Sequence, residues 1–304
     1  MENSVSLSGL HRFWAGGAAA LALTLLIFSV SPAAAAASSP PAGPAQSLER
    51  RLRVLVSNDD GVDAPGIIAL ARELSKFATV TVAAPAQNAS GASHGMTFSD
   101  PIFVTESEKD GVKWFGIRAT PATCVRLALE SLIAEKPDFV LTGINRGENL
   151  GLITYYSATL GSAREGSFSG IPAISVNLES GPGMDYSTAA EFAAALVRTL
   201  AKNPIKSGFF INVNVPNLAR DKIKGALVVP VDPQPPYQRF ERRVTPDGKV
   251  YYWNTYKPLV PGTEKTDVWA VRNGYISVSP LSIDPTDRAA LKALESLKVE
   301  GWKQ

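Results

Sequence analysis

The sequence has very few of the side chains that build most metal and nucleophile sites. Of its 304 residues, one is a cysteine, Cys124, and two are histidines, His11 and His94. A single cysteine excludes an intrachain disulfide, and these three residues cannot form a Cys/His zinc site. A Ser-His-Asp triad would have to use His94, because His11 lies in an N-terminal leader, and it is the weaker alternative. Any catalytic chemistry is therefore expected to depend on oxygen donors.

The chain also lacks a strong excess of charge of either sign. It contains 30 Lys and Arg against 28 Asp and Glu, which gives a formal net charge of +2. Proteins that hold nucleic acid as a stable partner usually present a strongly basic surface. The composition therefore argues against a stable nucleic-acid partner, although it permits a small nucleotide as substrate.

The most apolar segment is too short for a comfortable membrane span, which needs about 20 residues. This segment, residues 18–30, follows His11 and Arg12 and precedes a run of alanines that ends at Ala37. That order is typical of a secretory signal peptide. We therefore expect residues 1–37 to be a cleaved signal peptide and the mature protein to be exported, to the periplasm, without a membrane span. A cytoplasmic location is the alternative.

The folded part is expected to begin after a flexible leader at residues 38–50, which are rich in Ser, Pro and Ala. Over residues 51–225, short β-branched runs alternate with apolar residues at helical spacing, which predicts βαβ units. The expected fold is α/β, with a Rossmann-like, largely parallel sheet and helices on both faces. Strands are expected at residues 54–57, 79–83, 102–105, 113–117, 139–142, 173–177 and 209–215. The helical periodicity covers residues 67–77, 125–133 and 189–200.

The pattern changes at about residue 226, and residues 226–304 are expected to form a C-terminal extension. Pro, Arg and aromatic residues accumulate there, and Tyr251, Tyr252 and Trp253 predict an extended β-arm or hairpin. Exposed aromatic arms often mediate self-association. We therefore expect a homo-oligomer, either a dimer or a tetramer.

Polar side chains follow three of the expected strands. Asp59 and Asp60 come directly after the first strand, Ser90 or Ser93 lies in the long loop after the second, and Asn145 follows the strand at residues 139–142. The carboxyl ends of parallel strands meet at one edge of a sheet, where ligands bind. Carboxylate, hydroxyl and amide oxygens suit Mg²⁺ or Mn²⁺, with Ca²⁺ less favoured, and do not suit zinc or copper. The sequence therefore predicts one divalent metal ion.

The segment around Asn145 also predicts a phosphate site. Residues 143–151 contain three glycines and two asparagines, and hydroxyl-bearing residues open the helix that follows. Glycine lets the backbone approach a ligand, and a helix start attracts anions. A divalent ion beside a phosphate favours hydrolysis of a phosphate ester by metal-activated water. The alternative is an aspartyl-phosphate intermediate on Asp59 or Asp60, although the usual Asp-x-Asp spacing of that chemistry is missing.

Taken together, these motifs resemble one family, the SurE-type survival proteins. The resemblance covers about residues 53–283. Four motifs carry it: Ser-Asn-Asp-Asp-Gly-Val at 57–62 with Ala-Pro-Gly at 64–66, Asn-Ala-Ser-Gly-Ala-Ser at 88–93, Thr-Pro-Ala at 120–122 with Cys-Val at 124–125, and Gly-Ile-Asn at 143–145 with Asn-Leu-Gly at 149–151.

The resemblance implies a metal-dependent 5′-nucleotidase that hydrolyses nucleoside monophosphates. It implies that Asp59, Asp60, Ser90 and Asn145 hold the metal ion, which decides for Ser90 over Ser93. It further implies a C-terminal region used in oligomer formation, with a returning strand at residues 274–278. Three positions depart from the family pattern. Thr142 replaces a serine, Ala158 replaces a glycine beside the expected phosphate site, and Thr123 replaces an acidic residue.

The expected roles follow from these positions. Asp59 and Asp60 are the expected catalytic residues. Asn88, Ser157 and Thr159 are candidates to orient phosphate oxygens, and His94 is a possible general acid for the leaving 5′-oxygen. Arg146 and Glu148 either face the substrate or are solvated loop charges.

Other functions remain open at this point. A broad phosphatase or an exopolyphosphatase is a close alternative, because no residue that would recognise a base can be assigned. A non-catalytic exported protein that binds nucleotides or phosphate is an alternative of a different class, and an oligomeric structural protein is a third.

Overall fold

The computed structural model describes residues 50–204, 208–234, 238–256, 262–298 and 302. The expected signal peptide, residues 1–37, and all but the last residue of the expected leader lie outside the described residues. Within the described part, no helix has both the length and the apolar content that crossing a membrane requires.

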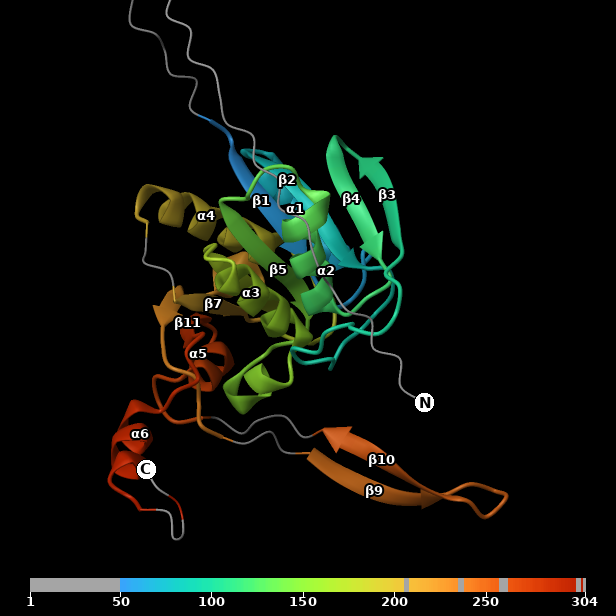
Figure 1. Ribbon diagram of the computed structural model, residues 1–304, viewed down its shortest axis with the longest axis vertical. Helices are drawn as coiled ribbons and strands as arrows, with labels where there is room; N and C mark the ends of the chain where they lie inside the picture. Colours follow the sequence, from blue (N-terminus) through green and yellow to red (C-terminus); the bar gives the residue numbers. More distant parts are fainter. Residues whose placement is uncertain (1–49, 205–207, 235–237, 257–261, 299–301, 303–304) are drawn as a thin grey trace, which may run out of the picture. The chain divides into compact units, whose positions relative to one another are not determined.

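The architecture is a nine-stranded sheet flanked by helices (Figure 1). The order of the strands is β3-β4-β2-β1-β5-β6-β7-β11-β8. Neighbouring strands from β4 to β7 pair in parallel, whereas β3 and β11 pair antiparallel to β4 and β7. The strands are β1 (Leu52–Ser57), β2 (Ala78–Pro85), β3 (Val104–Lys109), β4 (Val112–Ile117), β5 (Phe139–Arg146), β6 (Ala173–Leu178), β7 (Phe209–Val215), β8 (Ala226–Val228) and β11 (Ile276–Ser282).

Helices cover both faces of this sheet. They are α1 (Pro65–Ser75), α2 (Pro121–Leu127), α3 (Ala158–Phe168), α4 (Ser187–Lys202) and α5 (Asp267–Arg272). A further helix, α6 (Arg288–Glu295), has no buried residue. Side chains of α1 and α4 share one buried cluster with Val54 and Val56 of β1. Side chains of α2 and α3 share a second cluster with Leu55. Because successive strand residues point to opposite faces, this alternation along β1 places one helical layer on each side.

The fold class expected from the sequence is confirmed, with some differences in the elements. Strand β5 continues four residues beyond the expected end at Thr142, through a register shift between Thr142 and Asn145. The helix expected at residues 125–133 ends as α2 at Leu127 and continues as a π-helical turn over Ala128–Leu132. The spacing of apolar residues does not distinguish an α-helical turn from a π-helical turn, because both bury the same face of the helix.

The C-terminal region contributes to two sheets. Strand β11, which includes most of the returning strand expected at residues 274–278, joins the central sheet beside β7, and β8 pairs with it in parallel. The expected arm is a hairpin of β9 (Gln238–Val244) and β10 (Val250–Tyr256), which pair antiparallel as a separate two-stranded sheet.

Candidate active site

The turn after β1 holds two carboxylates in place through hydrogen bonds between the Asn58 side chain and the Gly61 backbone. The side-chain amide of Asn58 donates to the carbonyl oxygen of Gly61 at 2.8 Å, and the Gly61 amide donates back to Asn58 Oδ1 at 3.3 Å. Gly61 has a φ of +110°, a conformation that residues with a Cβ rarely adopt. This reciprocal pair fixes Asp59 and Asp60 at the carboxyl end of the strand.

Asp59 is almost fully buried, with 3 % of its surface exposed. Thr159 Oγ1 donates a hydrogen bond of 2.6 Å to Asp59 Oδ1. Burial raises the pKa of Asp59 to about 6, and the charge of Asp60 adds to this rise, while the Thr159 hydroxyl opposes it. The neighbouring Asp60 accepts a 3.0 Å bond from the backbone N–H of Arg146, and its pKa is also raised, mainly by burial.

Asn145 lies at the end of β5, beside these carboxylates in the sheet order. Its Nδ2 donates to the Gly147 carbonyl oxygen at 2.8 Å, which leaves Oδ1 as the donor atom available to a cation. The chain reaches this position through Gly143, which has a φ of +135° and precedes a cis peptide bond to Ile144. A Cβ on Gly143 would lie 2.3 Å from the Val176 carbonyl oxygen, so only glycine fits.

The loop after β2 is attached to the same turn. The Ala89 amide donates to the Asp59 carbonyl oxygen at 2.8 Å, and the Ser90 amide donates to Asn88 Oδ1 at 3.0 Å. The Ser93 hydroxyl donates instead to the Tyr155 carbonyl oxygen at 2.6 Å. Ser90 therefore follows directly after Ala89, which contacts the Asp59 backbone. The Ser93 side chain is bonded to Tyr155 instead.

Ser157 and Thr159 lie at the start of α3, as the sequence predicts, and their hydroxyls have different partners. Ser157 is the N-cap, and its Oγ accepts a bond of 3.3 Å from the Leu160 amide. Its hydroxyl hydrogen remains available for an anion. The hydroxyl hydrogen of Thr159 is already donated to Asp59. Thr159 thus positions a carboxylate, a contact that spacing alone does not reveal.

His94 has partners at both ring nitrogens. Its Nε2 lies 2.6 Å from Oε1 of the buried Glu165, and its Nδ1 lies 3.2 Å from Arg164 Nη1. The ring also stacks on Phe168, with 5.4 Å between centroids. Because a guanidinium can only donate, Nδ1 accepts and Nε2 carries the proton toward Glu165. This arrangement holds the loop against α3 and leaves no ring nitrogen for a serine or a leaving group.

A buried amide network supports the segment after Asn145. Asn149 Nδ2 donates to Asn177 Oδ1 at 2.7 Å, and the Asn149 backbone N–H donates to Asn214 Oδ1, also at 2.7 Å. The Gly151 amide donates to the carboxylate of the buried Asp267 at 2.9 Å. The segment that carries Asn145 is therefore fixed to β6, β7 and α5, and is not a free surface loop.

Arg146 and Glu148, two residues apart, lie in different environments. Glu148 Oε1 pairs with Arg272 at 3.0 Å, and Glu148 Oε2 accepts from the Ser180 amide at 3.0 Å. Arg146 is exposed and lines a cleft of about 650 Å³ beside Asp60. Glu148 is therefore structural, whereas Arg146 faces the space where a ligand would bind.

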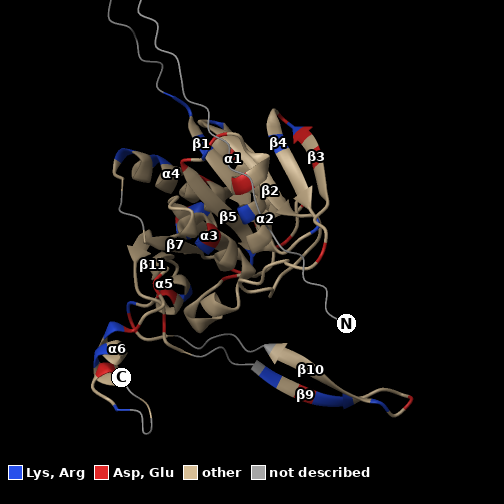
Figure 2. Ribbon diagram, in the orientation of Figure 1, with Lys and Arg blue, Asp and Glu red and all other residues tan. Residues whose placement is uncertain are grey.

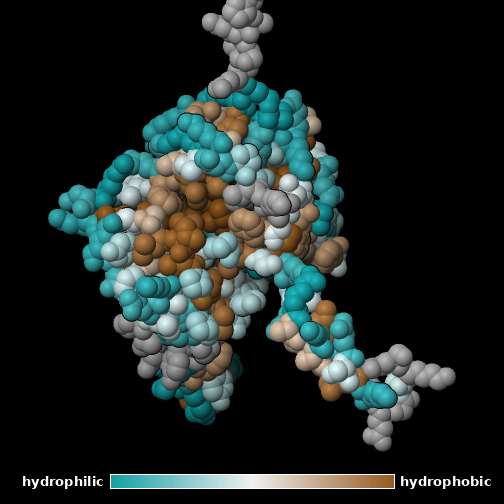
Figure 3. Space-filling view, turned by 90° about the vertical axis from the view of Figure 1, so that its left-hand side faces the viewer, coloured by the Kyte–Doolittle hydropathy of each residue, from teal (hydrophilic) through white to brown (hydrophobic). Residues whose placement is uncertain are grey.

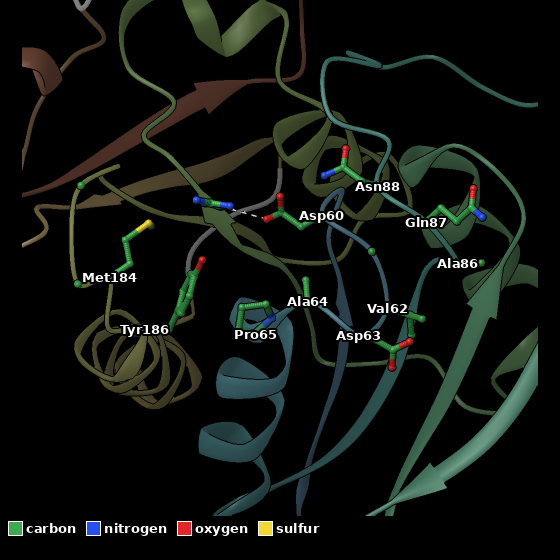
Figure 4. A pocket seen from close by; sticks show the side chains of 14 residues that line it. Asp60, Val62, Asp63, Ala64, Pro65, Ala86, Gln87, Asn88, Met184 and Tyr186 are labelled. Carbon is green, nitrogen blue, oxygen red and sulfur yellow. Dashed lines mark hydrogen bonds between the residues drawn. The ribbon is translucent and has the colours of Figure 1, made fainter.

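The cleft beside Asp60 is formed by three segments of the chain (Figure 4). Residues 61–65 and 86–88 form one wall, and Gly181, Gly183, Met184 and Tyr186, before α4, form the other. Its volume lies within the range of about 300–1,000 Å³ that small-molecule sites occupy. Sequence reasoning missed the second wall, because nothing local in Gly-Pro-Gly-Met-Asp-Tyr marks it as more than a turn before a helix.

The donor atoms fit a hard divalent cation. Two carboxylates, an amide oxygen and a hydroxyl are all oxygen donors, and burial raises the pKa values of Asp59 and Asp60, a cost of ionisation that a bound cation would offset. In the residues that the structure covers, no group of three or more His, Cys, Asp and Glu side chains is placed to bind a metal. Neutral oxygens would therefore have to complete the coordination of a cation by Asp59 and Asp60.

Comparison with known proteins identifies the family of this chain. The family model of the survival protein SurE matches residues 54–234, more than half of the chain. The chain belongs to the SurE survival-protein family. The resemblance inferred from the sequence motifs is thus confirmed.

Relatives of the SurE family match along most of their own length. The 5′-nucleotidase SurE of Geobacter sulfurreducens is 41% identical over 247 residues, 81% of this chain and 93% of the relative. The 5′-nucleotidase SurE of Alkalilimnicola ehrlichii is 39% identical over 256 residues, 83% of this chain and 95% of the relative. The crystal structure of the SurE protein from Aquifex aeolicus superposes with a TM-score of 0.71 at 35% identity, and covers 80% of this chain and 98% of that one.

Proposed function

We propose that this SurE-family protein is a divalent-metal-dependent phosphomonoesterase that hydrolyses nucleoside 5′-monophosphates to nucleoside and phosphate. One observation carries the proposal: Asp59 and Asp60 stand together at the carboxyl end of β1, beside Asn145, and Asp60 lines a cleft of about 650 Å³. The names of the two curated relatives, both 5′-nucleotidases, support the substrate class.

Asp59, Asp60, Ser90 and Asn145 would hold one Mg²⁺ or Mn²⁺ ion. When bound, such an ion supplies positive charge for the phosphate oxygens and lowers the pKa of a water molecule. The protein's own part is to fix its ligands. Thr159 orients the Asp59 carboxylate, and the Arg146 amide orients that of Asp60.

Ser157 and Asn88 are the residues that would bind the phosphate. Ser157 caps the N-terminus of the eleven-residue helix α3, where free backbone N–H groups favour an anion. Asn88 lines the cleft and uses its Oδ1 to hold Ser90, which leaves its amide N–H₂ as a donor. We assign no proton transfer to His94, because Glu165 and Arg164 occupy both of its ring nitrogens.

A non-catalytic binder with the same site is the alternative to exclude. Equilibrium dialysis of the protein with Mn²⁺ and adenosine 5′-monophosphate, followed by a phosphate assay on both chambers, separates the two functions. An enzyme releases phosphate in proportion to time and protein. Retention of intact nucleotide with no free phosphate would identify a binding protein.

We also propose that the hairpin mediates self-association. In its antiparallel register, Phe240, Val244, Val250 and Tyr252 share one face, and all four are exposed. Arginines lie along β9 (Figure 2), and the space-filling view shows apolar side chains gathered on one face of the core (Figure 3). An exposed apolar face of this kind usually packs against another surface.

Light scattering tests this second proposal. The full mature chain is expected to run as a dimer or tetramer, and a variant with residues 235–262 replaced by a short linker is expected to run at a smaller mass. An unchanged oligomer would contradict it.

A further inference from the structure

The hairpin arm joins the core at a buried pair of carboxylates that the proposed chemistry does not use. Residues 230–234 and 262–268 lie on either side of the arm and form the arm base. Asp232 and Asp267, one on each side, are both 0 % exposed. Asp267 Oδ1 accepts a 2.8 Å bond from the backbone N–H of Asp232 and another from that of Val268. Because a buried carboxylate is costly unless its oxygens are bonded, the groups that these two side chains hold indicate their role.

Asp232 holds together the two sides of the arm base. Its Oδ1 accepts from the Gln234 amide at 2.9 Å, and its Oδ2 accepts from the Thr263 amide at 3.0 Å and the Thr266 hydroxyl at 2.8 Å. A Cβ on Gly262 would lie 2.2 Å from Asp232 Oδ2, so the returning chain passes directly over this carboxylate. In the part of the chain that the structure describes, the Asp232 carboxylate therefore bonds only to groups of the arm base.

Asp267 also bonds to the active-site segment. Its second oxygen, Oδ2, accepts a 2.9 Å bond from the Gly151 backbone N–H. Gly151 begins the 3₁₀ helix η2 (Gly151–Tyr155), which leads to Ser157 at the start of α3. A small apolar cluster joins the same two elements, η2 and α5, and contains Leu150, Ile153, Val268 and Val271. The Asp267 carboxylate is therefore the polar centre of the contact between the arm base and η2.

The 3₁₀ helix transmits this contact to the phosphate end of the site. Thr154 Oγ1 donates to the Gly151 carbonyl oxygen at 2.9 Å, and the Tyr156 amide donates to that of Ile153 at 2.8 Å. Ser157, the N-cap of α3, follows directly. A 3₁₀ turn is tighter than an α-helical turn, and this one is bonded to itself at both ends. A shift of Gly151 therefore displaces Ser157.

The metal end of the site has anchors of its own. Asn145 precedes Gly151 on the same segment, but Asn149 lies between them and is bonded to Asn177 and Asn214, each at 2.7 Å. The two carboxylates of the site lie on a different segment, the turn after β1. Loss of the bond between Asp267 and Gly151 should therefore loosen the phosphate end and leave the metal end in place.

We propose that Asp267 is a positioning residue for phosphate binding: through the Gly151 N–H, its carboxylate fixes η2 and the Ser157 end of α3. The inference rests on the proposed function, and adds to it a residue of the arm base. Asp267→Asn keeps the size of the side chain but leaves one acceptor oxygen. If that oxygen keeps the bonds from Asp232 and Val268, the new amide N–H₂ faces the Gly151 N–H, and two donors meet. The substitution thus removes the Gly151 bond.

The test compares the affinity for inorganic phosphate with the affinity for metal. Calorimetry measures phosphate binding in saturating Mg²⁺, and Mn²⁺ binding without phosphate. Loss of a group that orients a ligand-binding residue typically costs about 10- to 100-fold, so Asp267→Asn is expected to weaken phosphate binding by that factor. The Mn²⁺ affinity is expected to stay within about twofold, because the metal end is held independently. In turnover of adenosine 5′-monophosphate, the change is expected mainly in KM.

Matched variants separate this contact from general damage to the arm base. Asp232→Asn alters the other buried carboxylate and leaves the Gly151 bond intact, so phosphate affinity is expected to stay within about twofold even if the melting temperature falls equally. Val268→Ala loosens η2 on α5 without changing a charge. It is expected to show a smaller loss with the same selectivity, which keeps the test valid if Asp267→Asn folds poorly. The exposed Asp100→Asn serves as control.

Equal weakening of phosphate binding in Asp267→Asn and Asp232→Asn would overturn the inference, because the effect would then come from the arm base as a whole. Unchanged phosphate affinity in both Asp267→Asn and Val268→Ala would overturn it too, as would a wild-type protein that binds no phosphate with metal present. Failure of a phosphate-binding wild type to hydrolyse adenosine 5′-monophosphate would refute the proposed function alone. The phosphate titration would still test the role of Asp267.

Discussion

Asp59→Asn gives a prediction whose magnitude comes directly from the structure. The side chain is 3 % exposed, and burial raises its pKa from the ordinary value of 3.8 to about 6. At about 1.36 kcal/mol per pH unit, that rise corresponds to about 3 kcal/mol. Because the folded-state pKa is the higher one, folding favours the protonated carboxyl. This contribution to stability is complete below about pH 4 and is lost as the pH rises through about 6.

The metal-free wild-type protein should therefore lose up to about 3 kcal/mol of unfolding free energy, relative to Asp59→Asn, between about pH 4 and pH 7. Asparagine carries no charge and still accepts the Thr159 hydroxyl bond. Urea unfolding in EDTA across this pH range measures the difference. Asp100→Asn, an exposed carboxylate, is the control and should follow the wild type.

Adding metal should remove most of this difference in stability. A ligand present at a hundred times its Kd stabilises the folded state by about 2.7 kcal/mol, and only the wild type should gain this. Phosphatase activity should be abolished in Asp59→Asn and retained in the control Asp100→Asn. A pH dependence identical in wild type and variant would refute the argument from burial. Equal stabilisation by Mn²⁺ would refute the ligand assignment.

Three further substitutions test individual contacts. Thr159→Val keeps the shape but removes the donor to Asp59, so calorimetry should show Mn²⁺ affinity reduced by about 10- to 100-fold, and an unchanged affinity would contradict its positioning role. Ser157→Ala should cost about 1 kcal/mol in urea unfolding through loss of the N-cap, and a raised KM in addition would support its contact with phosphate. His94→Gln should keep kcat within about threefold, whereas a fall of about 100-fold or more would identify His94 as the general acid.

The parts of the fold that depend on local periodicity could be predicted from the sequence. The alternation of β-branched runs with helical spacing gave the parallel strands and both helical layers, because each pattern reflects burial on one face. The continuation of β5 to Asn145 could not be predicted, since it depends on Gly143 fitting against Val176 of a neighbouring strand. The three-residue strand β8 is too short to show a period.

The candidate site likewise has residues that could be predicted from the sequence and residues that could not. Asp59, Asp60 and Asn145 were predictable because the carboxyl ends of adjacent parallel strands must meet. Tyr186 was not, because it lies more than a hundred residues beyond Asp60 and reaches the cleft only through the packing of α4 on α1. The partner of Thr159 likewise depends on how α3 packs against the turn after β1, and the partners of His94 on how α3 packs against the loop after β2.

The most direct test of the central claim is phosphate release by residues 38–304 from a panel of nucleoside 5′- and 3′-monophosphates and polyphosphate. Each is assayed with EDTA and again after Mg²⁺ or Mn²⁺ is restored. Release from the 5′-monophosphates that stops with EDTA and returns with metal is the predicted result. Release that persists in EDTA, or no release from any nucleotide while the protein holds a metal ion, would contradict the account.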